Sequence, residues 1–261
     1  MKKLLLATTA LAAFTGSAFA ADLPARTYTK APPPVVAANW TGFYIFGGAG
    51  GGIWASDQHT QVTGTGAPLA IDQRNGGSGW FGTVGAGYDW QINPSWVFGI
   101  LADGQFGSLR GDIHDTAMGW TGFEKLQDQW AAGARLGYLV APNVLSYVNG
   151  GYAGAHFSGT SFISTISGAA VGAHTNSFNQ NGWFIGGGVE NNLNIFGITA
   201  PGWFMKTEYR SSFYDQKAQT EFFDAGGGPT GRDIKFNNWN QTISTSLVYR
   251  FNWTGPVVAK Y

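Results

Sequence analysis

The sequence predicts an all-β protein: an eight-stranded antiparallel up-and-down β-barrel that spans a membrane, preceded by a signal peptide and a Pro-rich linker. Three observations support this prediction. From Trp40 onward, apolar and polar residues alternate with a period of two. Only 11% of the residues are charged, and long and short connections alternate between the periodic segments. A chain with so little charge cannot cover an ordinary water-facing surface, so we expect much of its outside to face lipid.

The N-terminal residues have the parts of a secretory signal peptide. Lys2 and Lys3 form a basic start, residues 4–14 are apolar, and a small-residue cleavage site ending at Ala20 leaves Ala21 as the new N-terminus. This apolar run is too short for a transmembrane helix, and no later segment is apolar for long enough. A mature chain embedded in a membrane must therefore be a closed barrel, because lipid offers no hydrogen-bond partner to an open backbone.

The mature chain divides into three parts. Residues 21–39 contain four prolines and are expected to form an extended periplasmic linker. Residues 40–253 are expected to form the barrel, and residues 254–261 a short tail.

The first four expected strands are 41–54, 80–92, 96–106 and 126–138. Each alternates between an apolar and a polar face, except that Asp128 interrupts the apolar face of the fourth. Their apolar faces are Phe43, Ile45, Ala49 and Ile53; Trp80, Val84, Tyr88, Trp90 and Ile92; Trp96, Phe98, Ile100 and Phe106; and Leu126, Trp130, Leu136 and Tyr138.

The last four expected strands are 144–156, 182–193, 203–214 and 239–251. Alternation in 144–156 is too poor to assign its faces. The apolar faces of the other three are Trp183, Ile185, Val189 and Leu193; Trp203, Met205, Tyr209 and Phe213; and Trp239, Ile243, Leu247, Tyr249 and Phe251. Every strand is long enough to cross a bilayer at the usual tilt.

The connections differ in length on the two sides of the barrel. The expected short turns are 93–95, 140–143 and 194–202; the expected long loops are 55–78, 107–124, 157–181 and 215–238. Short periplasmic turns and long external loops are typical of outer-membrane barrels, so both chain ends are expected on the periplasmic side.

Tryptophans cluster near the expected strand ends, where aromatic girdles meet the lipid headgroups. The residues expected in these girdles are Trp40, Trp54, Trp80, Trp90, Trp96, Trp183, Trp203, Trp239 and Trp253. Packing in a core, the commoner use of Trp in soluble proteins, would favour positions in the middle of strands.

The polar faces carry few charges, and these nearly balance. A soluble lipocalin-like barrel would show the same alternation with the charges outward. We favour the inverted arrangement because the bulky apolar faces are too large for an eight-stranded interior, whereas paired charges suit a narrow one. The expected lumen network consists of Asp89, Asp103, Arg135, Glu190, Lys206, Glu208, Arg210 and Arg250.

The end of the last strand is similar to the signal by which outer-membrane barrels are recognised for assembly. Tyr249 and Phe251 carry this similarity, which makes the barrel assembly machinery an expected partner. Two features depart from the signal: Ser246 stands where Gly is usual, and residues 252–261 follow the strand.

Several stretches carry a resemblance to a known family. They are Ala20-Ala21-Asp22-Leu23-Pro24, the Pro-rich linker, Trp40-Thr41-Gly42-Phe43-Tyr44-Ile45, Gly186-Gly187-Gly188-Val189-Glu190, Lys206-Thr207-Glu208-Tyr209 and Tyr249-Arg250-Phe251. With them the chain resembles the small outer-membrane immunogenic (surface antigen) proteins of alphaproteobacteria, relatives of the eight-stranded OmpA-type barrels of the porin family. The resemblance implies a structural and surface role in the cell outer membrane, in contact with its lipid and lipopolysaccharide. In some relatives the mature N-terminus is attached covalently to peptidoglycan, so the resemblance implies Ala21 as the attachment residue here.

The sequence gives no sign of an enzyme or a cofactor. It lacks cysteine, and its zero net charge gives no reason to expect nucleic acid as a partner. The four histidines fall in or beside the long loops without metal-ligand spacing, so no metal is expected. The primary hypothesis is a structural barrel that contributes to envelope integrity. The alternatives are a minor porin for small solutes, or haem binding at the surface loops.

Overall fold

The computed structural model describes residues 39–195 and 198–251. The expected signal peptide, the linker up to residue 38, Trp253 and the tail lie outside these residues. Within them, no helix is long and apolar enough to cross a bilayer. The strands are β1 Gly42–Val62, β2 Gln73–Gln91, β3 Trp96–Asp115, β4 Trp120–Ala141, β5 Val144–Phe157, β6 Thr160–Ser164, β7 Ala170–Thr175, β8 Phe178–Ile195, β9 Ile198–Tyr214, β10 Lys217–Phe223 and β11 Pro229–Arg250.

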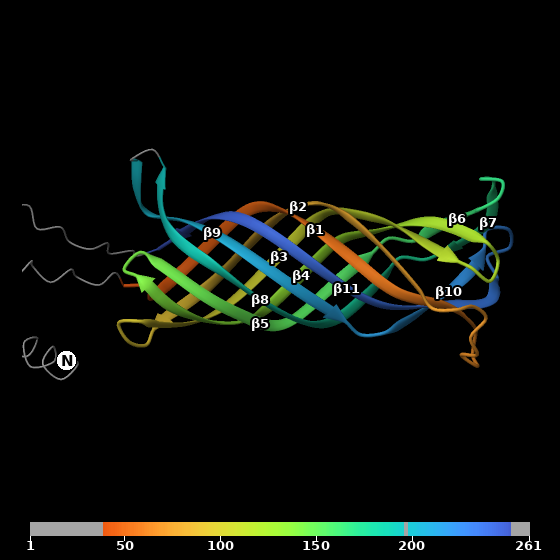
Figure 1. Ribbon diagram of the computed structural model, residues 1–261, viewed down its shortest axis with the longest axis horizontal. Coiled ribbons are helices and arrows are strands. Elements are labelled where there is room, and N and C mark those ends of the chain that lie inside the picture. The colour runs from red at the N-terminus through yellow and green to blue at the C-terminus, as the bar shows by residue number, and fades with distance from the viewer. Residues whose placement is uncertain (1–38, 196–197, 252–261) are drawn as a thin grey trace, which may run out of the picture. The chain divides into compact units, whose positions relative to one another are not determined.

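Eight of these strands close into a ring of antiparallel pairs, in the order β1-β2-β3-β4-β5-β8-β9-β11 (Figure 1). Pairing of β11 with β1, from Tyr44↔Arg250 to Val62↔Arg232, closes the ring. A closed ring leaves no unpaired edge, which is what a strand structure in lipid requires. The expected eight-stranded antiparallel barrel is therefore confirmed.

A second ring continues the first. Where β5, β8 and β9 end, β6, β7 and β10 take their places, which gives the order β1-β2-β3-β4-β6-β7-β10-β11. Short breaks at 158–159, 176–177 and 215–216 separate the two rings on one side of the barrel, whereas β1 to β4 and β11 pass through both.

The prediction of four long loops is therefore wrong in large part. The segments 55–78, 107–124, 157–181 and 215–238 are mostly strand, because their backbone groups pair in the second ring. We call the end of the barrel near Gly42 and Arg250 the proximal end, and the end formed by β6, β7 and β10 the distal end.

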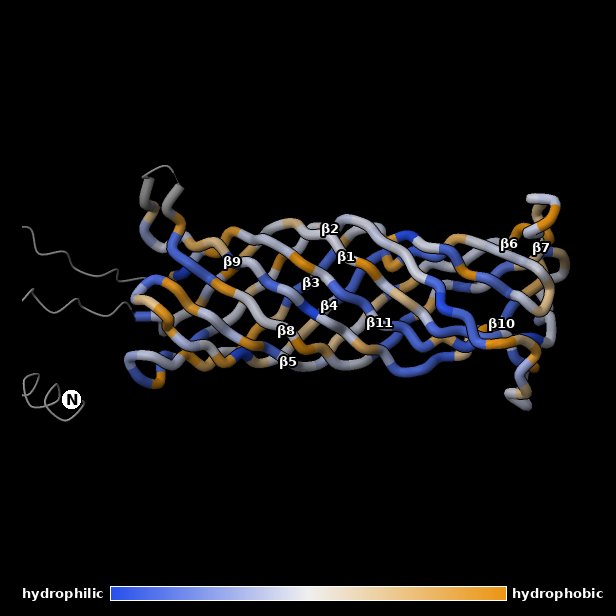
Figure 2. The backbone as a smooth tube through the Cα atoms, viewed as in Figure 1, coloured by the Kyte–Doolittle hydropathy of each residue, from blue (hydrophilic) through white to orange (hydrophobic). Residues whose placement is uncertain are grey.

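Along the strands, hydrophobic and hydrophilic residues alternate (Figure 2). In the proximal ring the exposed residues form an outward apolar belt that includes Phe43, Trp80, Ile100, Leu136 and Ile243. The inner faces of the same strands hold the charged residues, which are buried. This arrangement is the inverse of that in a soluble protein, and it suits a barrel surrounded by lipid.

In the distal ring the two faces exchange character, as β3 shows. Its outer face is apolar from Trp96 to Phe106 and polar from Ser108 to His114. Its inner face carries Asp103 and Gln105 proximally, and then Leu109 and Ile113. The strand therefore leaves lipid near residue 107 and continues as the wall of a water-facing barrel with a mainly apolar interior.

One face assignment is corrected at a β-bulge. Leu126 is 1% exposed and points inward, although the sequence pattern places it on the outer face with Trp130. The pairing of β4 with β5 shifts register between Leu126 and Asp128. The extra residue in the bulge reverses which side chains point inward, and this also explains the break that Asp128 makes in the apolar pattern.

Candidate functional site

The candidate site is the polar interior of the proximal ring. All eight side chains expected in the lumen network lie there, each at most 7% exposed. They form two clusters of four, each with two cationic and two carboxylate side chains, so that the formal charges of each cluster balance.

The first cluster is a closed cycle of ion pairs. Arg135 on β4 contacts both carboxylate oxygens of Asp89 on β2, and its Nη1 donates to Glu190 Oε2 on β8 at 3.1 Å. Arg250 on β11 binds the same two carboxylates, with Nε 2.7 Å from Glu190 Oε1 and Nη1 2.8 Å from Asp89 Oδ2, the oxygen that Arg135 also contacts. The four residues come from alternate strands of the ring, so the cycle spans the lumen.

The second cluster lies one layer further along, between opposite strands. Arg210 on β9 makes two hydrogen bonds to Asp103 on β3, at 2.9 and 2.7 Å. The same guanidinium contacts Glu208 at 2.7 Å, and Lys206 Nζ lies 3.5 Å from the other Glu208 oxygen. Tyr147 donates its hydroxyl proton to Glu208 at 2.8 Å. Paired planar contacts of this kind hold the guanidinium in one orientation and also balance its charge.

Aromatic rings pack against the cations and fill the remaining width. Arg135 and Arg250 lie 4.4 and 4.9 Å from the ring of Tyr44 on β1. Lys206 lies 3.4 Å from the ring of Phe46, and Arg210 lies 4.5 Å from that of Phe184. Cations over ring faces gain most where water is excluded. The sequence pattern did not single out these inward aromatic residues, because they stand next to bulky outward ones.

A glycine makes room for the first cluster. Gly99 on β3 faces the lumen beside Asp89, and a Cβ added there would overlap Oδ1 of that carboxylate. The carboxylate lies against its directly paired residue on the adjacent strand, and this close approach requires a residue without a side chain.

Beyond the ions, an uncharged layer leads to the distal core. Gln129 donates to Gln105 at 2.6 Å and accepts from the Tyr214 hydroxyl at 3.0 Å. Above these amides, Trp54, Phe157, Phe178 and other buried aromatic and aliphatic side chains fill the interior. The lumen therefore passes from ions, through amides, to a mainly apolar distal core.

The distal core contains two carboxyl groups of unusual acidity. Burial raises the pKa of Glu124 to about 8, and neither carboxylate oxygen has a hydrogen-bond partner among the described residues. Burial, together with the charge of Asp115, raises the pKa of Glu221 to about 7, although Arg232 lies 3.1 Å away and acts in the opposite direction. Isolated burial of a carboxyl group favours its protonated form.

Six of the tryptophans expected in the girdles lie on the outer face, in two groups at the two edges of the apolar belt. Trp90, Trp96 and Trp203 lie on the outer face near the proximal end, among Tyr88, Tyr138 and Tyr249. Trp80, Trp183 and Trp239 lie on the outer face at the other edge of the apolar belt. Trp130 joins them next to Tyr152, at 5.7 Å between ring centroids, although the sequence pattern did not select it.

Trp40 and Trp54 do not belong to the girdles, and their assignment is corrected. Trp40 is 1% exposed and its ring lies 4.4 Å from Arg250 inside the proximal end. Trp54 is 2% exposed inside the distal core, where Nε1 donates to the carbonyl of Leu109 at 2.9 Å. Both were misplaced because position near a strand end does not decide which face a residue occupies.

The remaining expected residues lie at the proximal end or outside the described part. Tyr249 and Phe251 are on the outer face, with ring centroids 5.0 Å apart, and Phe251 N donates to Phe43 O at 3.0 Å. Ala21 lies outside the described residues.

The histidines are not gathered into one place. His59 lies 2.8 Å from Asp72, and His174 lies 2.6 Å from Asp224. Within residues 39–195 and 198–251, no group of three or more His, Asp or Glu side chains could hold a metal ion.

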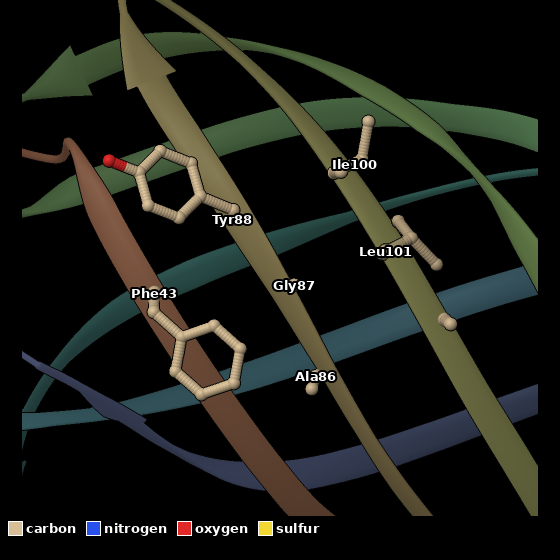
Figure 3. A pocket seen from close by; sticks show the side chains of 7 residues that line it. Phe43, Ala86, Gly87, Tyr88, Ile100 and Leu101 are labelled. Carbon is tan, nitrogen blue, oxygen red and sulfur yellow. The ribbon is translucent and has the colours of Figure 1, made fainter.

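A shallow hollow on the outer face also belongs to the apolar belt. Phe43, Tyr88 and Ile100 surround it, and Ala86 and Gly87 form its floor (Figure 3). Its position in the belt means that it faces lipid.

Comparisons with known proteins find a matching family and several similar proteins. The family model described as "Outer membrane protein beta-barrel domain" matches residues 6–251. The 31 kDa outer-membrane immunogenic protein of Brucella melitensis is 29% identical over 96% of this chain and 100% of its own length. Among solved structures, the attachment invasion locus protein Ail of Yersinia pestis gives a TM-score of 0.36 at 14% identity, over 78% of this chain and 99% of Ail. A major outer membrane protein of Thermus thermophilus gives 0.44 at 12% identity, over 78% of this chain and 99% of that chain.

Proposed function

Because the chain belongs to the outer membrane protein β-barrel family, we propose that it is a non-conducting, non-enzymatic structural barrel that contributes to the integrity of the cell envelope. One observation carries this proposal. The two neutral ion clusters cross the lumen, and their eight side chains are at most 7% exposed. An eight-stranded ring encloses little more space than its own side chains occupy, so these clusters leave no wide path for solutes.

The proposal includes an orientation and a set of partners. The described chain ends lie at the proximal end with the short turns, which supports a proximal end in the periplasm and a distal end outside the cell. The apolar belt would contact outer-membrane lipid, and the distal ring would rise through the lipopolysaccharide. Tyr249 and Phe251 would be read by the barrel assembly machinery.

Conductance tests the closed lumen. Purified protein reconstituted in planar bilayers should give no large, stable conductance steps, because the side chains of the two ion clusters fill the lumen. Folding is verified by heat-modifiable migration in gel electrophoresis. Stable large steps from folded protein would contradict the proposal and support the alternative of a minor porin.

Envelope permeability tests the biological part. A deletion strain should become more sensitive to detergents and bulky antibiotics, and the wild-type gene should restore resistance. Unchanged sensitivity would remove the envelope role while leaving the closed barrel intact.

A covalent link to peptidoglycan is a separate part of the proposal. It includes cleavage of the signal peptide after Ala20 and a Pro-rich periplasmic linker over residues 21–39. Mass spectrometry of purified sacculi should find peptides that begin at Ala21 and carry a peptidoglycan fragment. Finding only free Ala21 termini would remove this link.

A further inference from the structure

We propose that the outer face of β3 and β4 binds a phosphate group of an outer-leaflet glycolipid, of the lipopolysaccharide type, through Arg110 and Lys125. The inference rests on the outer-membrane location and on the orientation proposed above, with the distal end outside the cell, and does not depend on the envelope role.

The two cations face each other across a strand pair. Arg110 and Lys125 are directly opposite in the register of β3 and β4. Both point outward, since Leu109 and Gly111 on one strand and Glu124 and Leu126 on the other are buried. Like charges in directly opposite positions destabilise a sheet unless an anion lies between them.

No carboxylate on the protein supplies that anion. Within the described residues, neither Arg110 nor Lys125 forms an ion pair, and Asp112, the nearby acid on the same face, is paired with neither. Among the other outward cations of the described residues, Lys235 also lacks an ion pair, whereas Arg74 and Lys217 have partners. Arg74 binds Asp57 through two hydrogen bonds of 2.7 and 3.0 Å, and Lys217 donates to the carbonyl of Asn179 at 2.9 Å.

The guanidinium of Arg110 is already held in place. It lies 4.2 Å from the ring centroid of Phe123, one of the outward residues of β4. Stacking on a ring fixes the guanidinium plane and leaves the N–H groups at its edge free to donate. An Arg edge beside a Lys ammonium provides several donors to a tetrahedral oxyanion.

The height of the pair matches a lipid headgroup. Trp80, 81% exposed, marks the distal edge of the apolar belt. Ser78, two residues further along β2, is the partner of Arg110 across the strands. Two residues advance roughly 7 Å along a strand, and the headgroup region adds roughly 5–7 Å to each side of the hydrocarbon core. The two cations therefore lie in the headgroup region of the distal leaflet.

The charge of the pair selects the kind of phosphate. A phosphate monoester carries a charge of about −1.5 to −2 at neutral pH, whereas the phosphodiester of a glycerophospholipid carries a single charge. Two adjacent unpaired cations are best neutralised by the monoester. The outer leaflet of this membrane presents such groups on its glycolipid.

The test compares lipids that differ in phosphate. Folded protein in detergent is titrated with diphosphoryl lipid A, with its enzymatically dephosphorylated form and with phosphatidylglycerol. The variant is the double substitution Arg110→Gln with Lys125→Gln, and the matched control is Arg74→Gln. Native mass spectrometry measures bound lipid, and heat-modifiable migration verifies folding. If the double variant does not fold, Lys125→Gln alone and the salt dependence of wild-type binding take its place.

We expect the double variant to bind diphosphoryl lipid A at least tenfold more weakly than the wild type, and the control to bind it normally. Binding of the dephosphorylated lipid should be the same in all three proteins. Wild-type affinity of the double variant for diphosphoryl lipid A would overturn the proposal. An equal loss of phosphatidylglycerol binding would also overturn it, because the pair would then recognise lipid phosphate in general.

Discussion

Arg135 and Arg250 bind the same two carboxylates from strands that stand opposite each other in the proximal ring. Each arginine neutralises a part of both Asp89 and Glu190, so neither carboxylate depends on a single partner. Removing either arginine leaves two buried carboxylates with one cation.

Replacing Arg135 should therefore destabilise the barrel strongly. Arg135→Met is expected to lower the free energy of unfolding by about 3–5 kcal/mol, the usual cost of breaking a buried ion pair from one side. Urea unfolding in lipid vesicles, followed by gel migration, measures the change. The control is Arg74→Gln, which removes an exposed ion pair and should cost about 1 kcal/mol or less. Equal costs for the two variants would contradict a cooperative ion cycle.

Adding a methyl group at Gly99 should disturb the same cycle. Gly99→Ala is expected to cost about 1–3 kcal/mol, because the new Cβ overlaps the Asp89 carboxylate. Gly82→Ala is the matched control, since Gly82 faces outward and its Cβ would meet nothing closer than 3.9 Å. The same unfolding measurement applies, and a harmless Gly99→Ala would show that the lumen has spare room.

The two kinds of tryptophan should be distinguishable by their contact with lipid. Lipids brominated near the headgroup should quench less fluorescence after Trp80→Phe, because Trp80 is 81% exposed at the edge of the apolar belt. Trp54→Phe should leave the quenched component unchanged, because Trp54 is buried in the distal core. Loss of quenching in the Trp54 variant would place that residue in the girdle after all.

Truncation of Trp54 should cost far more stability than truncation of Trp80. Trp54→Ala is expected to cost about 3–5 kcal/mol, as for other large core side chains, and it also removes the hydrogen bond to Leu109. Hydrogen exchange should show the loss in β1 and β3 of the distal ring first. Uniform loss along both strands would indicate that the two rings unfold as one unit.

The distal core should lose stability as the pH rises. The pKa of Glu124 is about 8 in the folded protein, against an ordinary value of 4.5, so the folded state binds more protons than the unfolded state between these limits. Stability is therefore fully present below about pH 4.5 and falls by about 1.4 kcal/mol per pH unit as the pH rises towards 8.

Glu124→Gln should flatten this dependence, and hydrogen exchange in the distal strands between pH 5 and pH 9 measures it. A smaller slope should remain from Glu221, whose pKa is raised to about 7. An unchanged slope in the Gln variant would show that Glu124 is not the titrating group.

The proximal ring could be predicted from the sequence because one rule governs it. Strict alternation, as in residues 80–92, identifies strands, and a scarcity of charge indicates which face meets lipid. The positions of Asp103 and Arg210 on the polar faces follow from this alternation. Which acid meets which base does not follow, because the tilt and stagger of the strands decide the partners.

The distal ring was missed because it obeys the opposite rule. Leu109 and Ile113 alternate with Arg110 and Asp112, which is a clear strand pattern with charges outward. The sequence pattern therefore contained a signal for it. A bulge shifts the parity between the two rings on β4, so a search for one continuous apolar face fails at Leu126.

The three breaks between strands divide the barrel wall into a continuous side and an interrupted side. Five strands run without interruption through both rings. On one side of the barrel, three neighbouring strand positions are interrupted, at residues 158–159, 176–177 and 215–216. Continuous strands resist bending better than interrupted ones. We therefore expect the distal ring to bend more easily on the side of the three interrupted strands than on the side of the five continuous ones.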